Sequence, residues 1–128
     1  MEKDFDQWNK QKKQIHADGE NKLYHTREVW WCALGANIGF EQDGYGDAHR
    51  RPVIILKGLS KQTCFIIPLT TAANDHPLRP SVGRIAGKEA RALLSQIRVV
   101  DSRRLVRKIG YLQQDIFARI RKAAKELL

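Results

Sequence analysis

Short apolar blocks in the middle of the chain predict β-strands rather than helices. The clearest block, residues 52–56, is continuously apolar, which is typical of a strand buried on both of its faces. A hairpin-type turn, Gly58-Leu59-Ser60-Lys61, separates it from the next apolar block. The pattern predicts strands at residues 28–34, 51–57, 62–69, 81–85 and 96–100.

Two segments have the spacing of apolar side chains that indicates an amphipathic helix. The stronger one spans residues 112–128, and its apolar positions are Leu112, Ile116, Phe117, Ile120, Ala124 and Leu127. The weaker one spans residues 4–15, and a polar linker at residues 17–22 follows it. Residues 88–95 stay undecided, because their composition favours a helix but they lead directly into the strand predicted at residue 96.

These elements together predict a mainly β fold of the α+β kind. Several short strands and few helices favour a small, curved antiparallel barrel with one helix packed on it. The 128 residues are the usual size of one domain. We assign residues 23–128 to this domain and residues 1–22 to an N-terminal helical extension and linker.

The chain is strongly basic, and its charge is unevenly placed. The net charge is +9 and the sequence pI is about 9.9. Residues 84–128 contain twelve basic and four acidic side chains, whereas residues 1–28 contain six of each. A field of this kind favours a polyanionic partner such as nucleic acid, an acidic protein or an anionic membrane. A solvated basic face explains the charge alone equally well.

The cysteines and acidic residues provide no metal site. Cys32 and Cys64 each lie in an apolar run, which predicts two buried thiols in a reducing compartment. There is no CxxC pair, no cluster of cysteine and histidine at metal spacing, and no group of carboxylates in the centre. The first residues are charged, unlike a signal peptide, and no apolar run is long enough to span a membrane. We therefore expect a cytoplasmic protein without a metal cofactor.

Four segments, in order along the chain, resemble the MazF/PemK family of toxin–antitoxin toxins. They are Gly39-Phe40-Glu41-Gln42-Asp43-Gly44, Arg51-Pro52-Val53-Ile54-Ile55, Ile67-Pro68-Leu69-Thr70 and the stretch Gln96-Ile97-Arg98-Val99-Val100-Asp101-Ser102-Arg103-Arg104-Leu105. Each segment alone is a weak signal, but the ordered set is fairly specific. The resemblance covers roughly residues 26–128.

This resemblance implies an SH3-like barrel with a C-terminal helix and a homodimer with its active site in a groove at the interface. It also implies a metal-independent endoribonuclease that cuts single-stranded RNA, chiefly mRNA, and that a cognate antitoxin protein neutralises. In the family, the arginine of Arg-Pro-Val and the threonine that closes the third segment are catalytic. They match Arg51 and Thr70.

The chemistry of these two side chains agrees with the resemblance. Arginine stays charged and can bind two phosphate oxygens at once, which suits the extra charge of a pentacoordinate transition state. The hydroxyl of Thr70 can donate to a phosphate oxygen or orient the attacking 2′-OH. Two simpler interpretations stay open: Arg51 forms a surface ion pair with an acid of the preceding loop, or Thr70 makes an ordinary turn and Thr71 is the working residue.

Other residues are assigned to substrate binding or proton transfer. The long loop at residues 35–50 is glycine-rich, and loops of this length are often functional. On it, Glu41 and Gln42 are candidates for substrate binding. His49 is a candidate acid or base, although an exposed loop histidine is the simpler interpretation. Thr71, Gln96 and Arg98 complete the predicted substrate-binding set.

The sequence departs from the family pattern at three places. Arg27 stands where the family has glycine, the loop before Arg51 is longer, and the helix at residues 4–15 is additional. Two alternatives to a nuclease follow from the same fold. One is a non-catalytic binding protein, such as a gyrase-inhibiting toxin or a nucleic-acid-binding protein, and the other is a toxin that has lost its activity.

Overall fold

The computed structural model describes residues 23–34, 50–73 and 75–127. The predicted N-terminal helix at residues 4–15 and most of the glycine-rich loop lie outside the described residues, so both stay predictions. Within the described ranges no helix is long and apolar enough to cross a membrane.

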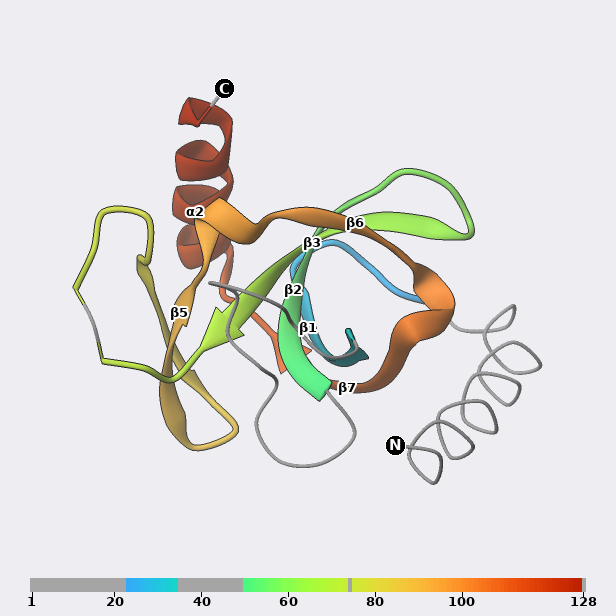
Figure 1. The fold of residues 1–128 in the computed structure, drawn as a ribbon, viewed down its shortest axis with the longest axis horizontal. Coiled ribbons are helices and arrows are strands. Elements are labelled where there is room, and N and C mark those ends of the chain that lie inside the picture. Colours follow the sequence, from blue (N-terminus) through green and yellow to red (C-terminus); the bar gives the residue numbers. More distant parts are fainter. Residues whose placement is uncertain (1–22, 35–49, 74, 128) are drawn as a thin grey trace, which may run out of the picture.

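Seven antiparallel strands and one C-terminal helix make up the described fold. The strands are β1 (Glu28–Ala33), β2 (Arg50–Gly58), β3 (Thr63–Thr70), β4 (Ser81–Ile85), β5 (Lys88–Ala92), β6 (Arg98–Asp101) and β7 (Leu105–Tyr111), and the helix is α2 (Gln114–Glu126). The sheet order is β4-β5-β3-β2-β1-β7, and β6 pairs with β3. Figure 1 shows the sheet curled into a half-barrel, with the β4–β5 hairpin to one side and α2 next to it. The predicted mainly β class with a C-terminal helix is confirmed.

Two apolar clusters fill the two faces of the central strands. On β2, Ile54 belongs to the cluster under α2, whereas its neighbours Val53 and Ile55 belong to the cluster inside the curl. All three are completely buried. A strand with both faces buried needs a continuous apolar run rather than an alternating one, and this confirms the interpretation of residues 52–56.

The two thiols belong to the cluster inside the curl. Cys32 and Cys64 are both buried and unbonded to each other, as predicted. Burial raises the pKa of the Cys32 thiol to about 12 and that of Cys64 to about 11. Both thiols are therefore neutral packing groups at physiological pH.

Helix α2 covers the other cluster with one face. Phe117, Ile120 and Ala124 are its buried side chains, spaced as the sequence predicts. The helix begins at Gln114 rather than at Leu112, which is buried in the connection from β7. On its outer side, Nη2 of Arg119 donates to the carbonyl of Ser81 on β4 at 3.3 Å.

The undecided segment at residues 88–95 is a strand and a short turn, not a helix. β5 pairs with β4 through a two-residue hairpin in which Ala86 and Gly87 have φ of +52° and +81°. Positive φ at both central positions matches the twist of a hairpin. Pairing with β4 on one side and with β3 on the other overrides the helical propensity of this segment.

Two further boundaries differ from the sequence prediction. The strand predicted at residues 96–100 is β6, Arg98–Asp101, and Gln96 instead ends a 3₁₀ turn, Leu94–Gln96. Strand β7, which the sequence analysis did not predict, pairs with β1 at the edge of the described sheet.

Arg27 has a backbone conformation that normally favours glycine. Its φ is +83°. Two backbone hydrogen bonds hold it there: its N–H donates to the carbonyl of Ile55, and its own carbonyl accepts from the N–H of Leu112, both at 2.9 Å. A residue with a Cβ at such an angle costs about 1–2 kcal/mol. The position where the family pattern has glycine is therefore strained in this chain.

The carboxylate of Glu28 is a buried anchor at the start of β1. It accepts hydrogen bonds from the His25 amide at 2.8 Å, from the Trp30 indole at 3.0 Å and from Nζ of Lys108 at 3.3 Å. Burial raises the pKa of Glu28, but these hydrogen bonds and the charge of Lys108 outweigh it, so that the pKa lies below its ordinary value. The ionised carboxylate thus ties β1 to β7 and fixes the preceding turn.

Replacing Glu28 with Gln should lower the free energy of unfolding by about 1.5–3 kcal/mol near pH 7, because hydrogen bonds to a buried charge are lost. A carboxylate with a lowered pKa stabilises the fold above its unfolded pKa, and this contribution disappears as the pH falls through the folded value. The difference between wild type and Glu28→Gln, measured by urea unfolding, should therefore shrink at pH values below about 4. Glu126→Gln, an exposed control, should change stability by under about 0.5 kcal/mol at either pH. A pH-independent difference would contradict this role for the charge.

Candidate functional site

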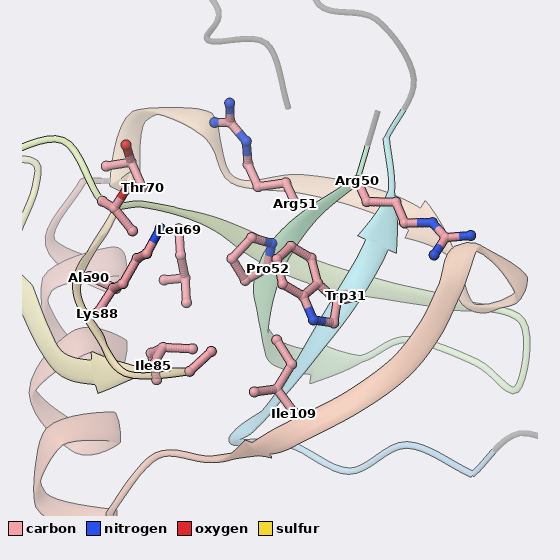
Figure 2. Close-up of a pocket in the computed structure, with 12 residues that line it drawn as sticks. Trp31, Arg50, Arg51, Pro52, Leu69, Thr70, Ile85, Lys88, Ala90 and Ile109 are labelled. Carbon is pink, nitrogen blue, oxygen red and sulfur yellow. The ribbon is translucent and has the colours of Figure 1, made fainter. Parts of the chain in front are cut away.

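A cleft of about 460 Å³ lies where β2 begins and β3 ends. Its apolar wall is formed by Trp31, Pro52, Leu69, Ile85 and Ile109, and Figure 2 shows these side chains grouped together. Its polar lining is formed by Arg50, Arg51, Thr70, Thr71 and Lys88. This lining contains three cations and no acidic residue among the described residues, so the cleft suits an anion with an apolar portion.

The cleft lies beyond the end of the ladder between β2 and β3. This ladder ends at Val53 and Pro68. On the other side of β3, the last two residues pair with β5, with Leu69 opposite Ala92 and Thr70 opposite Arg91. The first residues of β2 and the last residues of β3 therefore line the cleft instead of continuing the ladder.

Arg51 is held on β2 opposite Cys32 of β1, close to the start of the strand. The residue is only 4% exposed. In Figure 2 its guanidinium points toward the side of the cleft where Thr70 lies, whereas Arg50 points the other way. Arginine does not lose its charge on burial, so the cleft has a fixed, oriented positive charge at this edge.

Thr70 ends β3 and is 5% exposed. Its Oγ1 accepts a hydrogen bond from the N–H of Ala72 at 3.2 Å, which is a local turn bond that fixes the side chain. A hydroxyl can accept one hydrogen bond and donate another. The turn interpretation and the functional interpretation of Thr70 are therefore compatible.

Thr71, the alternative to Thr70, also lines the cleft but is exposed. A buried hydroxyl at a strand end is better fixed than one on the following loop. This difference favours Thr70 as the positioned group.

Lys88 is a cleft residue that sequence reasoning did not find. It is the first residue of β5, opposite Ile85, and its amino group points toward Leu69 and Thr70 in Figure 2. No pattern in the sequence marks it, because its place depends on β5 being a strand. Trp31 lines the cleft whereas Trp30 is buried inside the curl, so the two tryptophans face opposite sides as predicted.

Two of the other predicted site residues, Gln96 and Arg98, are not at the cleft. Gln96 lies in the 3₁₀ turn, and Arg98 is exposed at the start of β6, opposite Ile66 of β3. Neither lines the cleft. Glu41, Gln42 and His49 lie outside the described residues. In the described part of the chain, no group of three or more histidine, cysteine, aspartate or glutamate residues is placed to hold a metal ion.

Comparison with known proteins identifies the family to which this geometry corresponds. A family model described as "PemK-like, MazF-like toxin of type II toxin-antitoxin system" matches residues 25–128. A search of curated proteins finds no match.

Several solved structures share the fold. The crystal structure of MazF from Deinococcus radiodurans has a TM-score of 0.68 at 20% identity, covering 83% of this chain and 96% of that chain. An endoribonuclease in complex with its cognate antitoxin, from Mycobacterial species, has a TM-score of 0.63 at 17% identity, covering 81% and 93%. The toxin MazF-mt6 of Mycobacterium tuberculosis has a TM-score of 0.58 at 17% identity, covering 78% and 97%. At these identities the structural likeness shows the fold.

Proposed function

The chain belongs to the PemK-like, MazF-like family of toxins of type II toxin–antitoxin systems, and we propose that it is a metal-independent endoribonuclease that cuts single-stranded mRNA in the cytoplasm. One observation carries this proposal: Arg51 and Thr70, on different strands, line the same cleft, which contains cations and no acid among its described residues. A protein that only inhibits another protein does not need this pair.

The proposed reaction uses the nucleophile that RNA itself contains. The 2′-oxygen attacks the adjacent phosphorus, the bond from phosphorus to the 5′-oxygen breaks, and the products are a 2′,3′-cyclic phosphate and a 5′-OH. The 2′-OH gives its proton to a base, and the departing 5′-oxygen receives a proton. His49 stays the sequence-based candidate for one of these transfers. No metal-activated water is needed, because the attacking oxygen is already placed beside the phosphorus.

Arg51 supplies the charge that this reaction requires. Negative charge on the non-bridging phosphate oxygens increases in the transition state, and a preorganised guanidinium can bind two of these oxygens. Its burial limits competition from water, which strengthens the interaction. Thr70, which lines the same cleft from β3, donates to a phosphate oxygen or holds the 2′-OH.

The remaining predicted contacts extend along the RNA. Thr71 and Lys88 also line the cleft, and we propose that they contact the phosphate backbone. Glu41 and Gln42 stay proposals for base recognition. Gln96 and Arg98, which lie away from the cleft, are proposed to contact RNA beyond it.

Purified protein should cut a mixed single-stranded RNA in excess EDTA and leave 5′-OH ends, because Arg51 provides the charge stabilisation that a metal ion would otherwise supply. End labelling with polynucleotide kinase, with and without prior phosphatase treatment, distinguishes 5′-OH from 5′-phosphate products. A 5′-phosphate, or activity that disappears in EDTA and returns with magnesium, would exclude this mechanism. A protein that is folded and cuts no RNA would favour the binding-protein or inactive-toxin alternative.

Replacing Arg51 with Ala should lower the cleavage rate about a hundred- to a thousandfold, because one preorganised donor to the transition state is removed. Arg51→Lys should restore little, since lysine keeps the charge and loses the two-pronged geometry. Thr70→Ser should keep most of the activity because it keeps the hydroxyl. Thr70→Ala should lower the rate as much as Arg51→Ala if the hydroxyl holds the 2′-OH, and less if it only positions the phosphate. Single-turnover rates on one labelled RNA measure these effects, with circular dichroism to verify folding.

Arg50→Ala is the matched control for Arg51→Ala. It removes the same charge from the neighbouring position of β2, but its side chain points away from Thr70. Its rate should fall far less than that of Arg51→Ala. An Arg51→Ala protein with a nearly wild-type rate would refute the assignment.

We also propose that the toxin is a homodimer that an acidic segment of a cognate antitoxin neutralises. The positive charge of residues 84–128 and of the cleft lining attracts such a segment to the place proposed for RNA. A solved structure of similar fold is that of MazE–MazF from Deinococcus radiodurans. A disordered acidic chain can cover a long groove when it folds on binding.

Light scattering at micromolar concentration should give twice the mass of the chain. Addition of the antitoxin should abolish RNA cleavage, and the inhibition should weaken as salt increases because its attraction is electrostatic. A monomer would count against the dimer. Tight antitoxin binding that leaves cleavage unchanged would exclude the groove-blocking role.

A further inference from the structure

A second hollow, of about 390 Å³, lies at the start of β1 and the end of β7. No residue that lines it also lines the cleft. Its lining includes His25, Arg27, Tyr111 and Gln114, which combine cationic, aromatic and amide side chains. None of the functions assigned above uses these residues.

Tyr111 is a large aromatic side chain that remains exposed in the fold. It is 66% exposed although it ends a strand of the sheet. The guanidinium carbon of Arg27 lies 5.1 Å from the centroid of its ring, which is a cation–π contact. The arginine orients the ring while most of the side chain stays accessible to a ligand.

The backbone contacts of Arg27 do not explain why an arginine stands at this strained position. Glycine would adopt φ of +83° without cost, and the two backbone bonds of this residue, to Ile55 and Leu112, need no side chain. The arginine side chain is thus retained at a cost of about 1–2 kcal/mol. What it adds is the planar cation over Tyr111.

Arg27 gives the lining of the hollow a positive charge, which favours an anionic chain. His25 Nδ1 and Lys108 Nζ lie 3.5 Å and 3.3 Å from the carboxylate of Glu28. The one acid in the lining, Glu28, has its carboxylate engaged by Trp30, the His25 amide and Lys108, and its side chain is 11% exposed. A base stacked on Tyr111 would therefore have positive charge nearby for its phosphate.

We propose that Arg27 and Tyr111 form an accessory site that stacks a base of single-stranded RNA outside the cleft. The proposal rests on the proposed function for the identity of the ligand. Every nucleobase has a π-face, so an aromatic ring held by a cation binds bases of any sequence. The guanidinium of Arg27 and the amide of Gln114 are placed to donate to a base edge or a phosphate. The site lengthens the bound RNA beyond the segment in the cleft.

The test measures RNA affinity in full-length protein that contains Arg51→Ala, so that the RNA stays intact. Binding of a fluorescein-labelled single-stranded RNA is followed by anisotropy over a range of salt concentrations. Tyr111→Ala should weaken binding about tenfold, the usual size of one lost base–aromatic stack, whereas Tyr111→Phe should keep it. Arg27→Gly should weaken binding and lower the slope of log Kd against log salt by about one.

Arg27→Gly separates a binding role from a structural one. Glycine relieves the positive φ, so the melting temperature should rise or stay level while RNA affinity falls. A merely structural arginine would give unchanged or tighter RNA binding in the same variant. Arg121→Ala, which removes an equal charge from the exposed face of α2, is the matched control and should lower affinity less than Arg27→Gly.

Crosslinking locates the site directly. RNA containing 4-thiouridine, irradiated on the protein, should form an adduct in the peptide that contains Tyr111. Unchanged affinity in both Tyr111→Ala and Arg27→Gly would overturn the accessory site while leaving the nuclease assignment intact. Loss of antitoxin binding without loss of RNA binding would overturn it in favour of a protein partner. A parent protein that binds no single-stranded RNA would overturn both proposals, and the cleavage assay would show this independently.

Discussion

The rest of the structure depends on where β3 pairs with each of its three neighbouring strands. Along most of its length β3 pairs with β2 on one side and with β6 on the other, and its last two residues pair with β5. The ladder between β2 and β3 ends at Val53 and Pro68, and the cleft lies beyond this end. Arg51 and Thr70 line the cleft from the two strands that stop pairing there.

The end of the β2–β3 ladder also explains how a buried arginine is tolerated. A guanidinium inside an apolar core would be very unfavourable, but Arg51 lies where the core opens into a cleft. The apolar side chains around it reduce the screening of its charge, and Lys88 and Arg50 add to the positive field. These cations make the described lining of the cleft positive, which favours a phosphate group, and a preorganised field of this kind is what a phosphoryl transition state needs.

The sequence predicts the elements that depend on local pattern and misses those that depend on pairing. The continuous apolar run of β2 and the helical spacing of α2 identify these elements almost to the residue. β5 has helical composition, and β7 has Arg107 and Lys108 where an edge strand faces solvent, so neither shows a clear alternation. Lys88 was missed for the same reason, because it reaches the cleft only when β5 is a strand. Arg51 and Thr70 were predicted through family resemblance, whereas their convergence depends on long-range register.

At Arg27, the residue that local backbone propensity favours differs from the residue that the chain contains. Propensity predicts glycine at a position with positive φ, and a local reading of the sequence treats the arginine as a departure from the pattern. The backbone around it is fixed from both sides, by β2 through Ile55 and by the connection between β7 and α2 through Leu112, so the strain cannot relax without breaking one of these bonds. The fold can support this cost because the network around Glu28 stabilises the same turn. The hydrogen bonds that Glu28 accepts thus offset the backbone strain at Arg27. The side chain of Arg27 contacts Tyr111 and is available to a ligand.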